Sequence, residues 1–125
     1  MSSPVKPPGS DHPITIVPTR GRVMVKRGGI VIAESTRALT LTEASYPPVQ
    51  YIPRADARLD LMTSSAHRTH CPYKGDAAYY NLDDGNPGNG ENAVWTYEQP
   101  FPAVAAIAGH LAFYPNKVDS IEIAP

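Results

Sequence analysis

The stretch RVMVKRGGIVIAES, residues 22–35, carries the strongest structural signal in the chain. Two runs rich in β-branched side chains flank the pair Gly28-Gly29. β-branched residues favour strands, and a glycine pair accepts the positive φ angles that a tight two-residue turn requires. The stretch therefore predicts a β-hairpin, and we expect the fold to be built around it.

Short strand patterns continue outward from this hairpin in both directions. The 14 prolines and 9 glycines among 125 residues interrupt any longer pattern, so short strands and turns are expected instead of long helices. Two of the runs, 77–82 and 93–98, are expected to pair around the Gly- and Asn-rich segment 83–92, which predicts a mobile surface loop. The remaining expected strands are ITIV (14–17), RALTLTEA (37–44), VQYI (49–52) and DSIEI (119–123).

Two segments need a separate interpretation. In ADARLDLM (55–62) we prefer a turn at 55–57 and then a strand with Leu59 and Leu61 facing inward. In QPFPAVAAIAGHLAFYP (99–115) an α-helix is predicted, since a proline suits a first helical turn and another proline closes the segment. The residues that share a face at helical spacing are Val104, Ile107, Ala108 and Leu111.

These elements predict one small domain of the mainly β class, with seven to nine short, curved, antiparallel strands and one α-helix near the C-terminus. Residues 12–125 are expected to form the domain and residues 1–11 a flexible polar tail. The length suits a single hydrophobic core.

The charge balance and the cysteine count limit the partners. The net charge is −1, from 11 basic and 12 acidic residues, so nothing favours binding to nucleic acid or to an anionic membrane. No apolar run approaches the roughly 20 residues that span a bilayer, and MSSPVKPPGSDHP (1–13) lacks the apolar centre of a secretory signal. A single cysteine forms no internal disulfide, which is compatible with a cytoplasmic location.

The sequence offers no recognisable metal or cofactor motif. Structural zinc needs about four Cys or His ligands at fixed spacings, and this chain has one Cys and four His in separate contexts. The glycines of GNPGNG (85–90) lie between expected strands instead of before a helix, so they do not predict a phosphate-binding loop. We therefore expect neither a metal nor a cofactor.

The stretch HRTHCPYKGDAAYY (67–80) holds the densest collection of reactive side chains. Side chains alternate between faces along a strand, so Cys71 does not share a face with His70. Cys71 could be a nucleophile only with a more distant base; a small packed core residue is the favoured interpretation.

Lys74 has two interpretations. Pro72 and Gly75 indicate a turn of fixed geometry, in which Lys74 could anchor an anionic or carbonyl group beside nearby tyrosines. Alternatively, it is a surface lysine that caps the turn. Asp76 is expected either to pair with Lys74 or to bond to its own backbone.

Other polar and aromatic residues could complete a pocket around this lysine. Along the strand at 93–98, Trp95 and Tyr97 share one face and Glu98 lies on the other. The alternative for the lone Trp95 is a place in the core. The candidate ligand-binding residues are Tyr51, Arg54, Tyr73, Lys74, Trp95 and Glu98.

Six stretches resemble a known family: HPITI (12–16), RVMVKRGG (22–29), RALTLTEASYPPVQYIPR (37–54), THCPYKGDAAYY (69–80), NAVWTYEQPFPAVAAIAGHLAFYP (92–115) and VDSI (118–121). Together they are similar to the bacterial and fungal family named domain of unknown function 427. The CPYKG core followed by W-x-Y-E and A-G-H-x-A-F-Y is the most specific part of the resemblance.

This resemblance implies a compact, mainly β domain similar to the β-tent group, which includes methionine sulfoxide reductase B and the thalidomide-binding domain of cereblon. Several of those proteins carry a four-cysteine zinc site, which one cysteine cannot form. The family also bears a nucleotidyltransferase label, but the Gly-Ser and Asp-x-Asp arrangement of such enzymes is absent here.

Two functions from different classes follow. The first is a small-molecule-binding domain with an aromatic, lysine-lined pocket, which could also be an enzyme of unknown reaction. The motivating observation is that aromatic and polar residues gather in turns fixed by Pro and Gly. The second is a non-catalytic interaction or scaffold protein that forms a homodimer through a sheet edge or a flat face.

Overall fold

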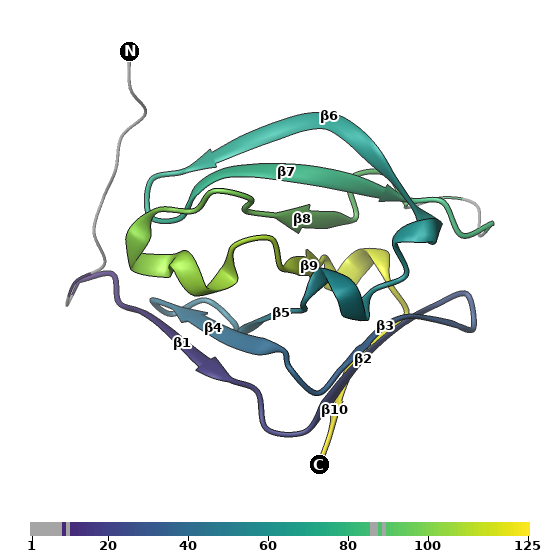
Figure 1. Ribbon diagram of the computed structural model, residues 1–125, viewed down its shortest axis with the longest axis horizontal. Helices are drawn as coiled ribbons and strands as arrows, with labels where there is room; N and C mark the ends of the chain where they lie inside the picture. The colour runs from purple at the N-terminus through teal and green to yellow at the C-terminus, as the bar shows by residue number, and fades with distance from the viewer. Residues whose placement is uncertain (1–8, 10, 86–87, 89) are drawn as a thin grey trace.

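Three antiparallel sheets make up most of the computed structural model, which describes residues 9, 11–85, 88 and 90–125 (Figure 1). The first sheet has the order β1-β4-β5, and the second has the order β10-β2-β3. The third sheet has four strands in the order β6-β7-β8-β9. The mainly β prediction is therefore confirmed.

The strands are short, as expected from the frequency of proline and glycine. Those of the first two sheets are β1 (Ile14–Pro18), β4 (Leu39–Glu43), β5 (Val49–Tyr51), β10 (Ser120–Ala124), β2 (Arg22–Arg27) and β3 (Ile30–Ser35). Those of the third sheet are β6 (Met62–Cys71), β7 (Gly75–Leu82), β8 (Val94–Thr96) and β9 (Leu111–Phe113).

The hairpin around Gly28-Gly29 is confirmed. Gly28 and Gly29 have φ angles of 58° and 77°, which the turn between β2 and β3 requires and glycine adopts without strain. Along β2, Val23 and Val25 point inward and are fully buried, as the alternation of a half-buried strand demands. The expected pairing of 77–82 with 93–98 is also present, with Tyr79 opposite Trp95.

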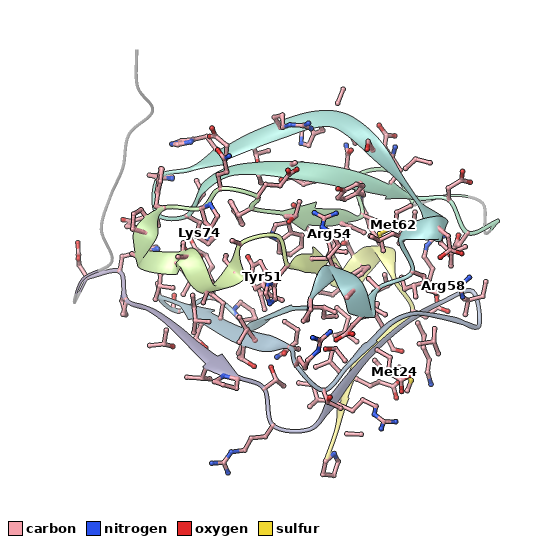
Figure 2. All side chains as sticks on the ribbon, viewed as in Figure 1. Met24, Tyr51, Arg54, Arg58, Met62 and Lys74 are labelled. Carbon is pink, nitrogen blue, oxygen red and sulfur yellow. The ribbon has the colours of Figure 1, made fainter. Side chains whose placement is uncertain are left out.

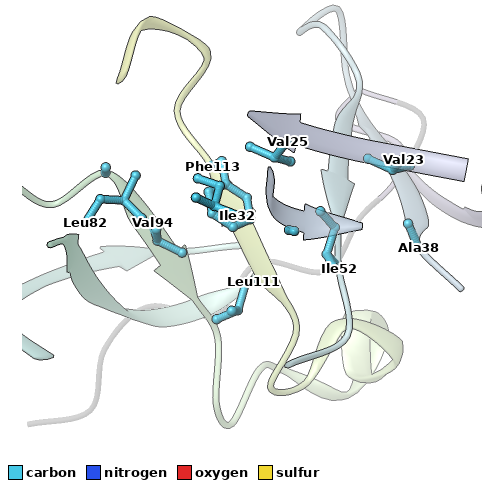
Figure 3. Close-up of a cluster of buried hydrophobic side chains, with 11 residues drawn as sticks. Val23, Val25, Ile32, Ala38, Ile52, Leu82, Val94, Leu111 and Phe113 are labelled. Atoms are coloured by element: carbon cyan, nitrogen blue, oxygen red, sulfur yellow. The ribbon is translucent and has the colours of Figure 1, made fainter. Parts of the chain in front are cut away.

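The core has two parts. One lies beside the β2–β3 hairpin, where Val25, Ile32 and Phe113 pack together with Val94 and Leu111 (Figure 3). The other gathers side chains of the first and third sheets and of the segment between β8 and β9: Leu41, Tyr51, Ala77, Tyr79, Tyr97, Val104, Ile107 and Ala112. This second part is rich in tyrosine, and it is the part from which the candidate site is built.

A backbone contact joins the first sheet to the third at the boundary of the two cores. The N–H of Ile52 donates to the carbonyl of Leu111 at 2.8 Å, and the N–H of Leu111 donates to that of Ile52 at 2.7 Å. This reciprocal pair lies directly after β5 and at the start of β9, so it fixes Tyr51 relative to the strands that carry the other aromatic residues.

The predicted C-terminal α-helix is wrong. Within the described residues the helical segments are short 3₁₀ turns, and the longest, Pro102–Ile107, is broken at Val104 (φ −124°, ψ 28°). Val104 and Ile107 are buried as predicted, but Ala108 is exposed and Leu111 belongs to β9. The apparent helical face combined a 3₁₀ spacing of three with the first residue of a strand.

The interpretation of 55–62 is also partly wrong. The turn exists, as the 3₁₀ segment Arg54–Asp56, but the next residues form a second 3₁₀ turn, Leu59–Leu61, and β6 begins only at Met62. Leu59 is 41% exposed, whereas Leu61 packs against the first core. A 3₁₀ turn places only one of the two leucines inward, where a strand would have placed both.

Several predictions fall wholly or partly outside the described residues. The tail 1–11 is described only at Gly9 and Asp11, and the loop 83–92 lacks 86, 87 and 89. The β-tent likeness and the domain boundaries stay predictions. Across the described ranges, no helix is long and apolar enough to cross a membrane.

Candidate functional site

An aromatic cleft opens between the first and third sheets, beside the second core. Its volume is about 260 Å³, and five of the seven tyrosines of the chain line it together with the only tryptophan. The lining residues are Leu41, Glu43, Tyr46, Pro47, Val49, Tyr51, Lys74, Tyr79, Trp95, Tyr97 and Tyr114.

One end of the cleft is closed by an ion pair between Lys74 and Glu43. Lys74 Nζ donates to Glu43 Oε1, and both side chains are largely buried, with 11% and 14% of their surface exposed. His12 Nε2 donates to the other carboxylate oxygen at 2.8 Å. Because both oxygens of the carboxylate are bound, Glu43 is held in one orientation at the end of β4.

The turn that carries Lys74 is fixed on both sides. Cys71 pairs with Gly75 across the β6–β7 hairpin, so Pro72, Tyr73 and Lys74 form a three-residue connection. The Lys74 carbonyl accepts a hydrogen bond from the N–H of Phe101 at 3.0 Å, and Gly75 has a φ of 117°. The expected rigid turn is therefore present, and it directs Lys74 inward, which excludes the interpretation of Lys74 as a surface residue.

The surroundings of Glu43 act on its pKa in opposite directions. Burial by itself would raise the pKa of this carboxyl, but the hydrogen bonds from Lys74 and His12, together with their charges, hold it below its usual value. Glu43 is therefore ionised at neutral pH. It offsets the positive charge of Lys74, so the pair is polar but carries no net charge into the cleft.

The aromatic walls are connected by hydroxyl and indole groups. Trp95 Nε1 donates to the Tyr51 hydroxyl at 3.2 Å, and the two rings meet edge to face with centroids 6.3 Å apart. The Tyr79 and Tyr114 hydroxyls lie 3.5 Å apart, and the Trp95 and Tyr114 rings are 4.5 Å apart. These contacts come from four strands or strand ends, which makes the wall rigid.

Burial also shifts the tyrosines of the cleft. It raises the pKa of Tyr51 and Tyr97 well above the ordinary value, and it raises the pKa of Tyr114 to about 12 with a contribution from the hydrogen bond to Tyr79. These hydroxyls stay protonated through the neutral range and can donate hydrogen bonds. Lys74 Nζ lies 5.9 Å from the centroid of the Tyr97 ring.

Tyr97 differs from the other tyrosines of the cleft. Only 6% of its surface is exposed, yet within the described part of the chain its hydroxyl forms no hydrogen bond. The hydroxyl oxygen is not itself fully enclosed, so water or a ligand in the cleft can reach it. Tyr97 lines the cleft, where such a partner has room.

The structure brings together three of the six candidate ligand-binding residues. Tyr51, Lys74 and Trp95 line the cleft, and in the view of Figure 2 Tyr51 lies between Lys74 and Arg54. Tyr73 lies next to the cleft but not in its wall, since its ring stacks on His12 at 3.6 Å with an angle of 9°. It holds His12 in position against Glu43.

The other two candidates lie elsewhere. Arg54 Nη1 donates to the Tyr80 hydroxyl at 2.8 Å and the guanidinium lies 5.4 Å from the Tyr80 ring. Glu98 lines a shallow depression beside Arg68 and Asp76. Its separation from Trp95 and Tyr97 is the alternation that the sequence predicts for this segment.

Sequence reasoning missed Glu43, which pairs with Lys74 in place of Asp76, for which that pairing was one of two expected roles. Asp76 instead lies 2.7 Å from His70 Nδ1 on the outside of the hairpin. The signal was present: Leu39, Leu41 and Glu43 alternate along one strand, so an acidic residue shares the inward face of two leucines. Other polar or aromatic residues in or beside the cleft that were not predicted include His12, Tyr46 and Tyr114.

Cys71 and the possible metal ligands are the remaining reactive side chains to be located in the structure. Cys71 is half-buried and packs against the second core, in agreement with the favoured interpretation. Among residues 9, 11–85, 88 and 90–125, no group of three or more His, Cys, Asp or Glu side chains could hold a metal ion. The small-molecule ligand, the homodimer and the cytoplasmic location stay predictions.

Comparison with known proteins gives a match that covers nearly the whole chain. No curated protein matches the chain. A family model described as a domain of unknown function (DUF427) matches residues 15–124. This range contains every residue of the cleft wall, and it contains all the strands apart from the first residue of β1. The match confirms the resemblance that the CPYKG and A-G-H-x-A-F-Y stretches indicated: the chain belongs to the DUF427 family.

Proposed function

We propose that the protein binds a small molecule in the aromatic cleft, with the polar part of that molecule directed toward Lys74 and Glu43. The observation that carries the proposal is the buried ion pair at one end of a cavity lined by tyrosines. Burying two charges costs free energy that a packed apolar pair would not, so a retained pair at a cavity supports a binding role.

The chemistry of the lining favours a neutral ligand that contains a ring. Lys74 and Glu43 offset each other, so neither an anion nor a cation gains a full countercharge. The faces and edges of Trp95, Tyr51 and Tyr114 suit a flat apolar ring. The Tyr97 hydroxyl, which lacks a partner among the described residues, would donate to a carbonyl or a similar acceptor on that ring.

Titration with small ring compounds tests the proposal. Amide spectra of ¹⁵N-labelled protein would be recorded with phenol, indole and nicotinamide as separate probes. We expect at least one probe to shift the amides of Lys74, Trp95 and Tyr97 together, in a saturable way. Shifts confined to other faces, or no saturable shifts with any of the three probes, would overturn the proposal.

A matched pair of variants separates cleft binding from general adhesion to the surface. Val49 lines the cleft, so Val49→Trp fills it and should abolish the shifts. Val17→Trp places the same side chain at a position of the same sheet that is 53% exposed, and should leave the shifts unchanged. Equal behaviour of the two variants would contradict a site in the cleft.

A further inference from the structure

A second, smaller pocket adjoins the cleft and shares two lining residues with it. Its volume is about 80 Å³, and it lies where β10 and β2 approach the ends of β5 and β9. Its apolar lining includes Val25, Ile52, Trp95, Phe113, Pro115 and Ile121. Whereas the cleft presents hydroxyls and an ion pair, this pocket is bounded mostly by apolar surface.

The one polar side chain in this lining is already occupied. Gln50 Oε1 accepts from the Thr19 hydroxyl at 2.6 Å, and Gln50 Nε2 donates to the Thr40 hydroxyl at 3.0 Å. The amide is therefore engaged at both of its ends, by β4 and by the residue that follows β1. An occupant of this pocket would meet apolar surface and would gain little from a polar group of its own.

The two cavities share part of their walls. Trp95 and Val49 line both of them, so the pocket begins where the cleft ends. Trp95 is only half-buried, and its indole N–H is directed to Tyr51 on the cleft side. A molecule seated in the cleft would thus have an apolar extension of the same site within reach.

We infer that the small pocket is a subsite for an apolar substituent, an alkyl chain or a small hydrocarbon group, carried by the ligand of the cleft. The inference rests on the proposed function and adds to it the class of ligand: a neutral ring with a polar group on one side and a short apolar substituent on the other. Trp95 lines both cavities: the cleft offers hydrogen-bond donors to the polar group, and the small pocket offers apolar surface to the substituent.

A pair of probes that differ only in the substituent tests the inference. Phenol and 4-propylphenol would be titrated against the intact protein, with the fluorescence of Trp95, the only tryptophan, as the readout. Each methylene fully removed from water is worth about a four-fold gain in affinity, so a ten-fold gain requires the burial of fewer than two of the three propyl carbons. We expect 4-propylphenol to bind about ten-fold more tightly than phenol, with amide shifts that extend to Ile121 and Phe113.

Two variants on the same strand locate the gain. Ile121→Thr makes the pocket wall polar and should remove most of the ten-fold difference between the probes. Ile123→Thr, at a 51% exposed position of β10 outside both cavities, should preserve that difference. If one variant unfolds the protein, Phe113→Leu offers a milder change of the same wall and should also reduce the difference.

The outcomes distinguish the two proposals. If phenol binds in the cleft and the propyl group adds less than a two-fold gain, or if the gain survives Ile121→Thr, the subsite is refuted and the proposed function stands. If neither phenol nor 4-propylphenol perturbs the cleft, and indole and nicotinamide also fail, the proposed function itself is refuted.

Discussion

Among the described residues, the ion pairs Arg27–Asp84 and Lys74–Glu43 are both largely buried, and their surroundings differ. Arg27 and Asp84 are almost completely enclosed, with 3% and 0% of their side chains exposed, and Arg27 also donates to the carbonyls of Lys117 at 3.1 Å and of Gly88. Lys74 and Glu43 are slightly more accessible and form one end of a cavity. The first pair ties loops together, whereas the second faces space that a ligand could fill.

This difference shows how burial alone fails to identify a functional site. Both pairs bear the cost of removing charges from water. At Lys74 the neighbouring side chains, tyrosines and a tryptophan, leave room beside the pair and include a hydroxyl that the described residues do not satisfy. We therefore expect changes at Arg27 to act on stability alone, and changes at Lys74 to act on both stability and binding.

The largest expected effect is that of Arg27→Met. The change leaves the Asp84 carboxylate enclosed without its cation, and breaking a buried pair in this way costs about 4 kcal/mol of the free energy of unfolding. Urea denaturation followed by circular dichroism measures this loss. Probe binding in the cleft should persist under folding conditions; a loss of binding by folded Arg27→Met protein would contradict a purely structural role.

Lys74→Met should cost less, about 2 kcal/mol, because Glu43 keeps its hydrogen bond from His12 and some contact with water. Adding Glu43→Gln should recover part of this loss, since the remaining charge disappears. Probe binding should be weakened in both variants. A single Lys74→Met variant as stable as the wild type and with unchanged binding would remove the distinction between the two pairs.

Local sequence patterns predicted several of the strands, because each of these has its own signal. The glycine pair at 28–29 and the alternation along β4 are local, and they specify the β2–β3 hairpin and the inward face of Leu39 and Leu41. The C-terminal segment was misread because 3₁₀ turns and a short strand, read together, imitate a helical period. Periodicity over one turn cannot separate these alternatives.

The site was only partly predictable for a different reason. Lys74 and Trp95 could be found because a turn and a strand alternation direct them locally. The partner of Lys74 lies 31 residues away, and the pairing depends on how the first sheet packs against the third. His12 reaches Glu43 across the same separation in sequence. Such contacts are properties of the assembled sheets, which no local pattern encodes.

Two tyrosines of the cleft should respond oppositely to removal of their hydroxyls. Tyr51→Phe loses the acceptor for the Trp95 indole N–H and should cost about 1 kcal/mol. Tyr97→Phe removes a hydroxyl that has no described partner and should leave stability unchanged or slightly raised while weakening the binding of nicotinamide, whose carbonyl can accept from it. A clear loss of stability in Tyr97→Phe would contradict its assignment to the ligand.

The smallest expected effects appear with pH. A tyrosine whose pKa is higher in the folded state stabilises the fold fully below its unfolded value near 10, and this contribution is lost as pH rises through the folded value, about 12 for Tyr114. For Glu43, whose folded pKa is lowered, the contribution is present above about 4.5 and is lost as pH falls below it. Thermal unfolding measured across pH tests both contributions to stability, and tyrosinate absorbance follows the ionisation of the tyrosines. Equal ionisation of all seven tyrosines near pH 10 in the folded protein would contradict the buried cleft.

Soaking crystals of the wild-type protein with a set of small ring compounds tests the central claim most directly. We predict that the bound compounds gather in the aromatic cleft, with their rings against Trp95 and a polar atom directed toward Tyr97 or Lys74. Compounds found only on outer surfaces, with the cleft occupied by a rearranged Tyr46 or closed by the approach of the two sheets, would contradict the claim that this cavity is a binding site.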